Sequence, residues 1–194
     1  VAGLNVVVLQ SFKLLFVPLA ARLLARQDTA GIEHLFTHTT IWIAIASFPV
    51  FAVTFLFAKP LAVLLFGARY ADAGAVLAIL ALGEYFNAAL GLNSQLMQVY
   101  GRVWLIMGIS LAVVVVNLAL GLWLIPLYGA FGAAMASCAS IVAHNLLNQA
   151  GLAYGTGLRV FPAESLRAYG SIALAAIALL AVQSIGSPPL VVPV

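Results

Sequence analysis

Long apolar stretches, separated by short polar or charged segments, dominate the hydrophobic pattern of this chain. A helix crosses the hydrocarbon core of a bilayer with about 20 consecutive apolar residues, and about six stretches reach that length. The predicted membrane helices cover residues 1–22, 40–66, 72–99, 103–125, 129–154 and 168–186. The pattern therefore predicts an all-α polytopic membrane protein with no soluble domain.

The composition supports this fold class and excludes others. The chain is 65% hydrophobic and 7% charged, whereas soluble domains carry roughly 25% charged residues, which excludes a water-soluble globule. The net charge of +3 includes no basic patch with interleaved aromatics, so no nucleic-acid partner is expected. The single cysteine, Cys138, permits no intramolecular disulfide and lies among small residues, which indicates a packing role.

Basic residues in the loops predict how the chain is oriented. Cytoplasmic loops of membrane proteins carry an excess of Lys and Arg. One set of connections carries Arg22, Arg26, Arg102, Arg159 and Arg167, and the other set carries Lys59 and Arg69. The first set is therefore expected in the cytoplasm. Since the chain begins at Val1 within apolar sequence, we expect it to be an internal piece of a longer protein.

Polar residues in the predicted span 72–99 gather on one side of the helix. At 100° per residue they fall within an arc of about 80°. They are Glu84, Asn87, Gln95 and Gln98, with Gly91 between them. A polar stripe along a membrane helix faces the bundle interior or a water-filled cavity. We interpret it as a substrate-cavity lining; the alternative is interhelical hydrogen bonding, worth about 0.6 kcal/mol per contact.

A second stripe of small and polar residues follows the predicted span 129–154. It consists of Ser137, Ser140, His144, Asn148 and Gly151. Small residues allow close helix packing, which is the preferred interpretation of its first half. His144 and Asn148 remain weaker cavity candidates, with a hydrogen-bonded structural histidine as the alternative. In the span before it, Asn117 is expected to make a single interhelical contact.

Lys13 is the least expected residue in the first span. It precedes Arg22 by nine residues, which places it about 13 Å from the expected cytoplasmic end of the helix. An intramembrane lysine indicates function, and here it would attract a phosphate or pyrophosphate. Gln10 lies near its face as a weaker candidate, and Glu84 would bind a coupling proton or sodium ion. The alternative is a structural ion pair between Lys13 and Glu84.

Motifs of catalysis are missing from the sequence. The chain has no nucleotide-binding glycine loop, no nucleophile elbow and no metal-ligand motif. We therefore expect a transporter or another membrane protein rather than an enzyme, with no cofactor and no metal site.

Three segments carry a resemblance to a known family. They are VPLAARLLARQDTAGIEHLF (17–36), LAVLLFGARYADAGAVLAILALGEYFNA (61–88) with its FG-x-x-Y-x-x-A pattern, and QVYGRVWLIMGISLAVVVVNLALGLWLIPLYGAFGAAMAS (98–137). In order and spacing they resemble the C-terminal half of prokaryotic polysaccharide flippases, within the multidrug/oligosaccharidyl-lipid/polysaccharide exporter superfamily. The likeness runs over residues 1–160.

This resemblance implies a two-lobed transporter of 12 to 14 helices that works by alternating access around a central cavity. Residues 1–38 would then end the N-terminal side, as one membrane helix and a cytoplasmic loop. Residues 39–194 would form most of a truncated C-terminal lobe.

The implied substrate is undecaprenyl-pyrophosphate-linked oligosaccharide, moved from the inner to the outer leaflet for O-antigen, capsule or exopolysaccharide assembly. The implied location is the cytoplasmic membrane of a bacterium or archaeon, with polysaccharide polymerase or ligase machinery as candidate partners. Two rivals remain open at this point. One is a multidrug or toxin cation antiporter of the same superfamily, and the other is a non-transporting membrane scaffold.

Overall fold

A computed structural model describes residues 4–158, and every element in that range is a helix. The elements are α1 (Leu4–Ala25), α2 (Thr29–Leu56), α3 (Ala58–Phe66), the short 3-10 helix η1 (Ala68–Tyr70), α4 (Ala73–Leu90), α5 (Asn93–Val99) and α6 (Val103–Thr156). The all-α fold class is thus confirmed. The predicted span 168–186 lies outside the described residues.

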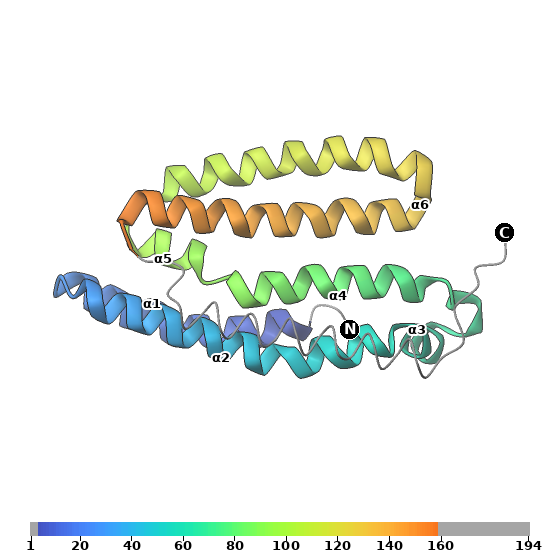
Figure 1. Cartoon of the computed structure of the whole chain (residues 1–194), viewed down its shortest axis with the longest axis horizontal. Helices are drawn as coiled ribbons and strands as arrows, with labels where there is room; N and C mark the ends of the chain where they lie inside the picture. Colours follow the sequence, from blue (N-terminus) through green and yellow to red (C-terminus); the bar gives the residue numbers. More distant parts are fainter. Residues whose placement is uncertain (1–3, 159–194) are drawn as a thin grey trace.

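The longest element, α6, is a hairpin of two helices rather than one straight rod. Gly129 has φ 58° and ψ −131°, a conformation that only glycine adopts readily. The chain reverses there, so residues 103–128 form a first arm and residues 130–156 a second arm that lies alongside it (Figure 1). These arms correspond to the two predicted spans 103–125 and 129–154.

The helices pack in layers with α4 in the middle (Figure 1). One side of α4 packs on α6, and the other side packs on α2, which in turn packs on α1. The α1–α2 turn, the α5–α6 junction and the end of α6 lie at one end of the bundle. The opposite end holds α3 and the Gly129 turn. For the described residues, the alternation of the spans therefore agrees with the predicted grouping of the basic residues; Arg159 and Arg167 lie outside the described residues.

Two helix boundaries differ from the sequence-based expectation. The expected loop over 23–39 is short, because α2 already begins at Thr29, where the Asp28 carboxylate accepts a hydrogen bond from Gly31 N at 2.8 Å. The expected single span 40–66 is divided at Phe57 into α2 and α3. Pro60 has no N–H and therefore fits the first turn of the new helix.

Apolar packing holds α1 and α2 against α5. Phe16 and Phe36 meet edge to face with ring centroids 6.4 Å apart, and Leu92 and Leu96 are fully buried in the same cluster. A second cluster joins α2 to α4, where Phe51 and Tyr85 stack at 4.7 Å. The first cluster brings the end of α4 into contact with α1 and α2, and the second brings the middle of α4 into contact with α2.

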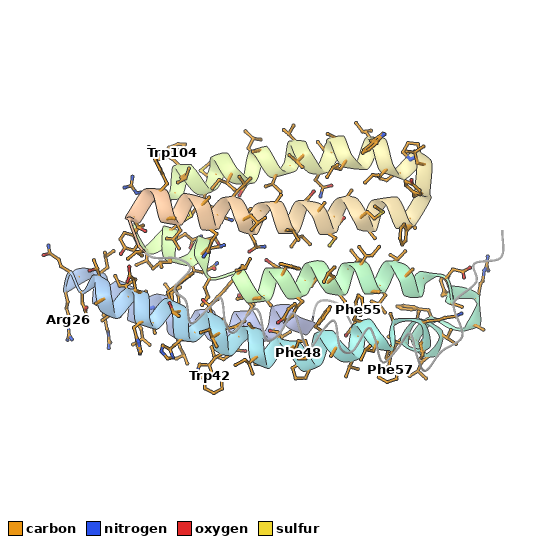
Figure 2. The ribbon with its side chains drawn as sticks, viewed as in Figure 1. Arg26, Trp42, Phe48, Phe55, Phe57 and Trp104 are labelled. Atoms are coloured by element: carbon orange, nitrogen blue, oxygen red, sulfur yellow. The ribbon has the colours of Figure 1, made fainter. Side chains whose placement is uncertain are left out.

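The outer surface carries large apolar side chains, as a lipid-facing surface requires. Trp42 on α2 and Trp104 on α6 are 60% and 83% exposed and point away from the bundle (Figure 2). Three described segments are long and apolar enough to cross a membrane: Thr29–Leu56, Ala73–Val99 and Val103–Thr156. The last of these contains both arms of α6.

Candidate functional site

The candidate site is built around a helix break. The path of α4 is interrupted at Gly91 and Leu92 before α5 begins at Asn93. The Asn93 side chain accepts a hydrogen bond from Ser94 N at 2.7 Å, which satisfies one of the free N–H groups at the new helix start. Breaks of this kind at membrane depth are tolerated where protein or a cavity surrounds them.

Helix α1 packs directly on this break. A Cβ atom at Gly91 would lie 2.7 Å from Leu9 Cδ2, so the absence of a side chain at Gly91 allows the close approach of α1. Leu9 is 2% exposed. Lys13 follows Leu9 by one helical turn, and Gln95 follows Gly91 by the same interval. The packing of Leu9 on Gly91 therefore brings Lys13 next to Gln95.

Gln95 joins Lys13 to the helix break. Its amide is assigned in the orientation in which both ends find partners. In that orientation the nitrogen donates to Gly91 O and, at 3.3 Å, to Ser94 Oγ, while the oxygen accepts from Lys13 Nζ at 3.2 Å. Both Lys13 and Gln95 are half-buried. The lysine is thus held by a neutral acceptor.

Lys13 and Glu84 form no ion pair in the part of the chain that the structure describes. The structural alternative for Lys13, an ion pair with Glu84, is therefore not seen among the described residues. Among the described residues the Lys13 ammonium is held by an amide, which carries no net charge, so its positive charge is not compensated there. Such a group is available to an anion.

The level of Lys13 within the bundle is set by α5. Because Leu9 meets Gly91 and Lys13 meets Gln95, α1 runs parallel to α5. Gln95 precedes Val99, the last residue of α5, by four residues, or about 6 Å along a helix. Lys13 thus lies nearer to the level of the α5–α6 junction than the 13 Å expected between it and the cytoplasmic end of its own helix. The two values differ because α1 and the start of α2 project beyond that junction (Figure 1).

Glu84 belongs to a chain of amides between α4 and the second arm of α6. Asn87 Nδ2 donates to Glu84 Oε2 at 3.4 Å, and Asn145 Nδ2 donates to Asn87 Oδ1 at 3.4 Å. Asn93 Nδ2 donates to Asn145 O at 2.9 Å. Asn93 and Asn145 are buried, and Glu84 and Asn87 are half-buried. The two ends of this chain lie on α4 and at the helix break.

The structure does not bring all the predicted candidates together. Gln10 on α1 and Gln98 on α5 are exposed. Asn148 is 1% exposed, and its Oδ1 has no hydrogen-bond partner among the described residues. The buried Nε2 of His144 likewise has no hydrogen-bond partner among them. The predicted candidates are thus divided into a Lys13–Gln95 pair, the Glu84–Asn87 pair and a group on α6.

Close packing explains the first half of the second stripe. A Cβ atom at Gly83 would lie 3.2 Å from Cys138 Cα, so α4 and the second arm of α6 approach at this point. Ser140 Oγ donates to Ala136 O of its own helix at 2.8 Å. These contacts agree with the packing interpretation of the small residues and of Cys138.

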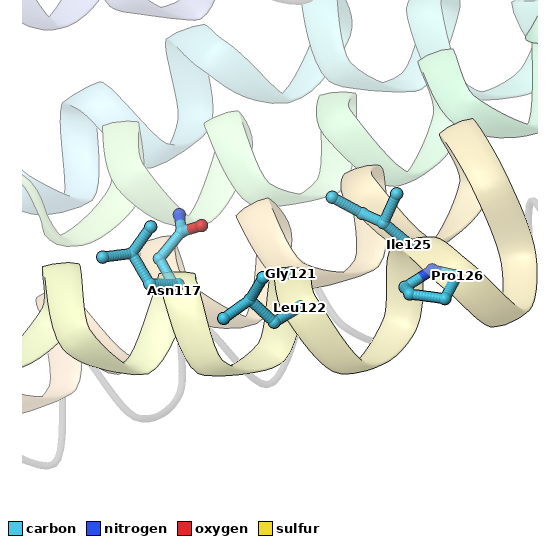
Figure 3. Close-up of a pocket in the computed structure, with 6 residues that line it drawn as sticks. Asn117, Gly121, Leu122, Ile125 and Pro126 are labelled. Atoms are coloured by element: carbon cyan, nitrogen blue, oxygen red, sulfur yellow. The ribbon is translucent and has the colours of Figure 1, made fainter.

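Asn117 differs from the expectation of an interhelical contact. It is exposed on the first arm of α6 and forms no hydrogen bond within the described residues. It borders a shallow hollow of ≈ 290 Å³ (Figure 3). The hollow is lined by Asn117, Leu118, Gly121, Leu122, Ile125 and Pro126. Its lining is apolar apart from the single amide.

Sequence reasoning missed the two buried asparagines of the amide chain. Asn93 follows Glu84 by nine residues, which at 100° per residue places it opposite the stripe, so the helical period gave no signal for it. Asn145 stands three residues before Asn148, and the i, i+3 spacing that places these two residues on one face was the available signal.

At the α5–α6 junction lies a further buried polar group, the hydroxyl of Tyr100. The hydroxyl of Tyr100 is buried and has no hydrogen-bond partner among the described residues. Burial raises the pKa of Tyr100 above its ordinary value, and the negative charge of Glu33 raises that pKa further. Tyr100 therefore stays protonated at neutral pH as a hydrogen-bond donor.

The sequence of this chain matches a known family over most of its length. The MatE family model matches residues 1–123. The chain belongs to the MatE family. No curated protein and no solved structure matches the chain. The match covers α1 to α5 and most of the first arm of α6.

Membership of the MatE family confirms part of the resemblance seen in the sequence. The chain is a multi-pass membrane protein and a transporter of the multidrug/oligosaccharidyl-lipid/polysaccharide exporter superfamily. MatE proteins are transporters rather than enzymes. The non-transporting scaffold is accordingly the weaker of the two rivals, whereas the multidrug antiporter stays compatible with the family.

Proposed function

We propose that this MatE protein is part of a flippase for undecaprenyl-pyrophosphate-linked oligosaccharide, moving it from the inner to the outer leaflet by alternating access. The observation that carries the proposal is Lys13, a half-buried ammonium whose partner is the neutral amide of Gln95. A cation on a membrane helix that has no acidic partner among the described residues favours an anionic substrate over a cationic one.

The level of Lys13 supports the same substrate. About one helical turn separates it from the level of the α5–α6 junction, close to the depth at which lipid phosphates lie. A pyrophosphate there can meet the ammonium while its lipid tail stays in the hydrocarbon core.

The remaining parts of the proposal concern the whole transporter. The protein acts in the cytoplasmic membrane of a bacterium or archaeon, beside polysaccharide polymerase or ligase machinery. The break between α4 and α5, together with Pro18 and Pro49 inside α1 and α2, supplies bending points for alternating access. Glu84 takes up the coupling proton or sodium ion.

Replacement of Lys13 tests the proposal. We expect Lys13→Gln in the full-length protein to reduce surface glycan at least roughly tenfold, since removal of a buried charge partner for an anion lowers its binding strongly. The assay uses a strain without its own lipid-linked oligosaccharide flippase and measures exported glycan alongside the amount of protein in the membrane.

The matched control is Lys59→Gln, because Lys59 is exposed at the opposite end of the bundle, on α3. We expect this variant to export glycan normally. Undiminished export by Lys13→Gln, at equal membrane levels, would remove the pyrophosphate role from Lys13 and the support from the proposal.

A second candidate function is a cation antiporter, and Glu84 is the observation in its favour. Glu84 accepts a hydrogen bond from Asn87 and forms no ion pair within the described residues, so its carboxylate is open to a cationic drug. For an antiporter we expect Glu84→Gln to abolish efflux of a cationic dye while Lys13→Gln leaves efflux intact. The opposite pattern, lost glycan export with Lys13→Gln and no dye efflux, favours the flippase.

A further inference from the structure

Gln95 occupies a position at which its chemical type matters. Its oxygen faces the Lys13 ammonium at 3.2 Å, and its nitrogen faces the Gly91 carbonyl at the helix break. A side chain there must therefore accept from a cation on one side and donate to a carbonyl on the other. Of the side chains of this size, the carboxamide meets both demands without adding charge.

We infer that Gln95 determines the charge selectivity of the site by holding the Lys13 ammonium in place without neutralising it. This inference rests on the proposed function, since it assumes that Lys13 binds an anion. Glutamate has the same shape but would place a carboxylate against Lys13 and form an ion pair. A paired lysine attracts a pyrophosphate less strongly, and the added carboxylate repels it.

Gln95 acts as a positioning residue through Lys13, so its role differs from plain helix packing. Packing depends on the volume of the side chain, which Gln95→Glu preserves. The charge of the Lys13 pair depends on the acceptor, which Gln95→Glu changes. Gln95→Glu therefore tests the charge of the acceptor, and the exchange variant below, which keeps a donor to Gly91 O, controls for the hydrogen bond that Gln95→Glu loses.

Protection of Lys13 from an amine-reactive reagent tests the inference. The full-length protein in detergent is labelled with and without inorganic pyrophosphate, and the modified lysines are identified by peptide mapping. Lys59, exposed on α3, reports the reactivity of the reagent itself. In the unmodified protein we expect pyrophosphate to protect Lys13 and to leave Lys59 reactive.

For Gln95→Glu we expect half-protection of Lys13 to need at least roughly tenfold more pyrophosphate, because the ion pair competes with the ligand. The control is Gln98→Glu, which adds the same charge to α5 at an exposed position. We expect its half-protection to stay within about twofold of the unmodified protein, as for a screened surface charge.

An exchange of the two side chains provides a second measurement, which does not depend on the stability of Gln95→Glu. In Lys13→Gln combined with Gln95→Lys, the introduced ammonium can donate to Gly91 O and to the new amide on α1. We expect pyrophosphate to protect the introduced lysine, because the net charge of the pair is unchanged.

The outcomes separate the inference from the function on which it rests. Equal protection of Gln95→Glu and the unmodified protein would overturn the role of Gln95 and leave anion binding by Lys13 standing. Loss of protection in the exchange variant would overturn it as well. Absence of protection in the unmodified protein would contradict anion binding itself, and with it the proposed flippase.

Discussion

Three asparagines, Asn87, Asn93 and Asn145, connect the middle of the bundle through their side-chain amides. Their hydrogen bonds run between α4, the helix break and the second arm of α6. Within an apolar environment each such bond satisfies groups that would otherwise be left unpaired. At the scale of single residues, this chain of amides is what ties the break to α6.

Asn145 is the member whose replacement tests this connection. We expect Asn145→Leu to lower the free energy of unfolding by about 1 kcal/mol, the scale of interhelical side-chain hydrogen bonds in membranes. It removes the donor to Asn87 Oδ1 and leaves that oxygen unpaired. Thermal unfolding of the purified protein in detergent measures the change.

The matched control is Asn117→Leu. Asn117 is exposed and forms no hydrogen bond within the described residues, so its replacement should leave the unfolding temperature unchanged. Equal losses in the two variants would show that the Asn145 bonds contribute nothing specific to the fold.

At the scale of elements, two glycine positions decide the path of the chain. Gly91 allows Leu9 of α1 to lie against the α4–α5 break, and Gly129 turns α6 into a hairpin. The first brings Lys13 to Gln95, and the second returns the chain so that the second arm packs on α4. The candidate site needs both, since its groups come from α1, α4, α5 and α6.

The hairpin turn in α6 gives a prediction at this scale. We expect Gly129→Ala to destabilise the protein by about 1–3 kcal/mol, because a residue with a Cβ is strained at φ 58° and ψ −131°. The thermal unfolding temperature in detergent is the measurement. A Cβ atom at Gly129 would have no neighbouring atom within 4 Å, so the expected loss comes from backbone strain alone.

Gly108→Ala is the control for this change. Gly108 lies within the first arm of α6, and a Cβ atom there would likewise have no neighbouring atom within 4 Å, but its backbone is helical. Alanine favours helix over glycine by about 1 kcal/mol, so we expect no loss of stability. A Gly129→Ala protein as stable as Gly108→Ala would contradict the strained turn.

At the scale of the whole molecule, the charged connections divide between the two ends of the bundle. The end with the α1–α2 turn carries Arg22, Arg26 and Arg102, and the end with α3 carries Lys59 and Arg69. The positive-inside rule assigns the first end to the cytoplasm. The projecting α1–α2 hairpin would then extend from the inner membrane surface.

Cysteine labelling tests this orientation. In a Cys138→Ser background we expect Gln27→Cys to react with an impermeant thiol reagent only after the membrane is opened. Tyr70→Cys should react in intact cells. Both positions are exposed, so accessibility within the protein is matched. Reaction of Gln27→Cys from outside would reverse the orientation and move Lys13 to the outer leaflet side.

Much of the architecture could be predicted because it depends on local sequence. The predicted spans 72–99, 103–125 and 129–154 agree with the described helices, and Gly129 marks the turn between the last two. Less could be predicted where neighbouring helices decide the outcome. The stripe containing Gln95 and Gln98 assumed an unbroken helix, whereas the break separates Glu84 and Asn87 from Gln95.

The sequence by itself determined that this is an all-α membrane protein, where most of its helices run and which polar residues lie within them. Hydrophobicity and helical period are local properties, so they can be read along the chain. Only the tertiary structure decided that Lys13 meets Gln95 rather than Glu84, that Asn145 bonds to Asn87, and that Lys13 lies near the level of the α5–α6 junction. Those contacts join residues far apart in the chain, and they depend on how closely helices pack at positions such as Gly91.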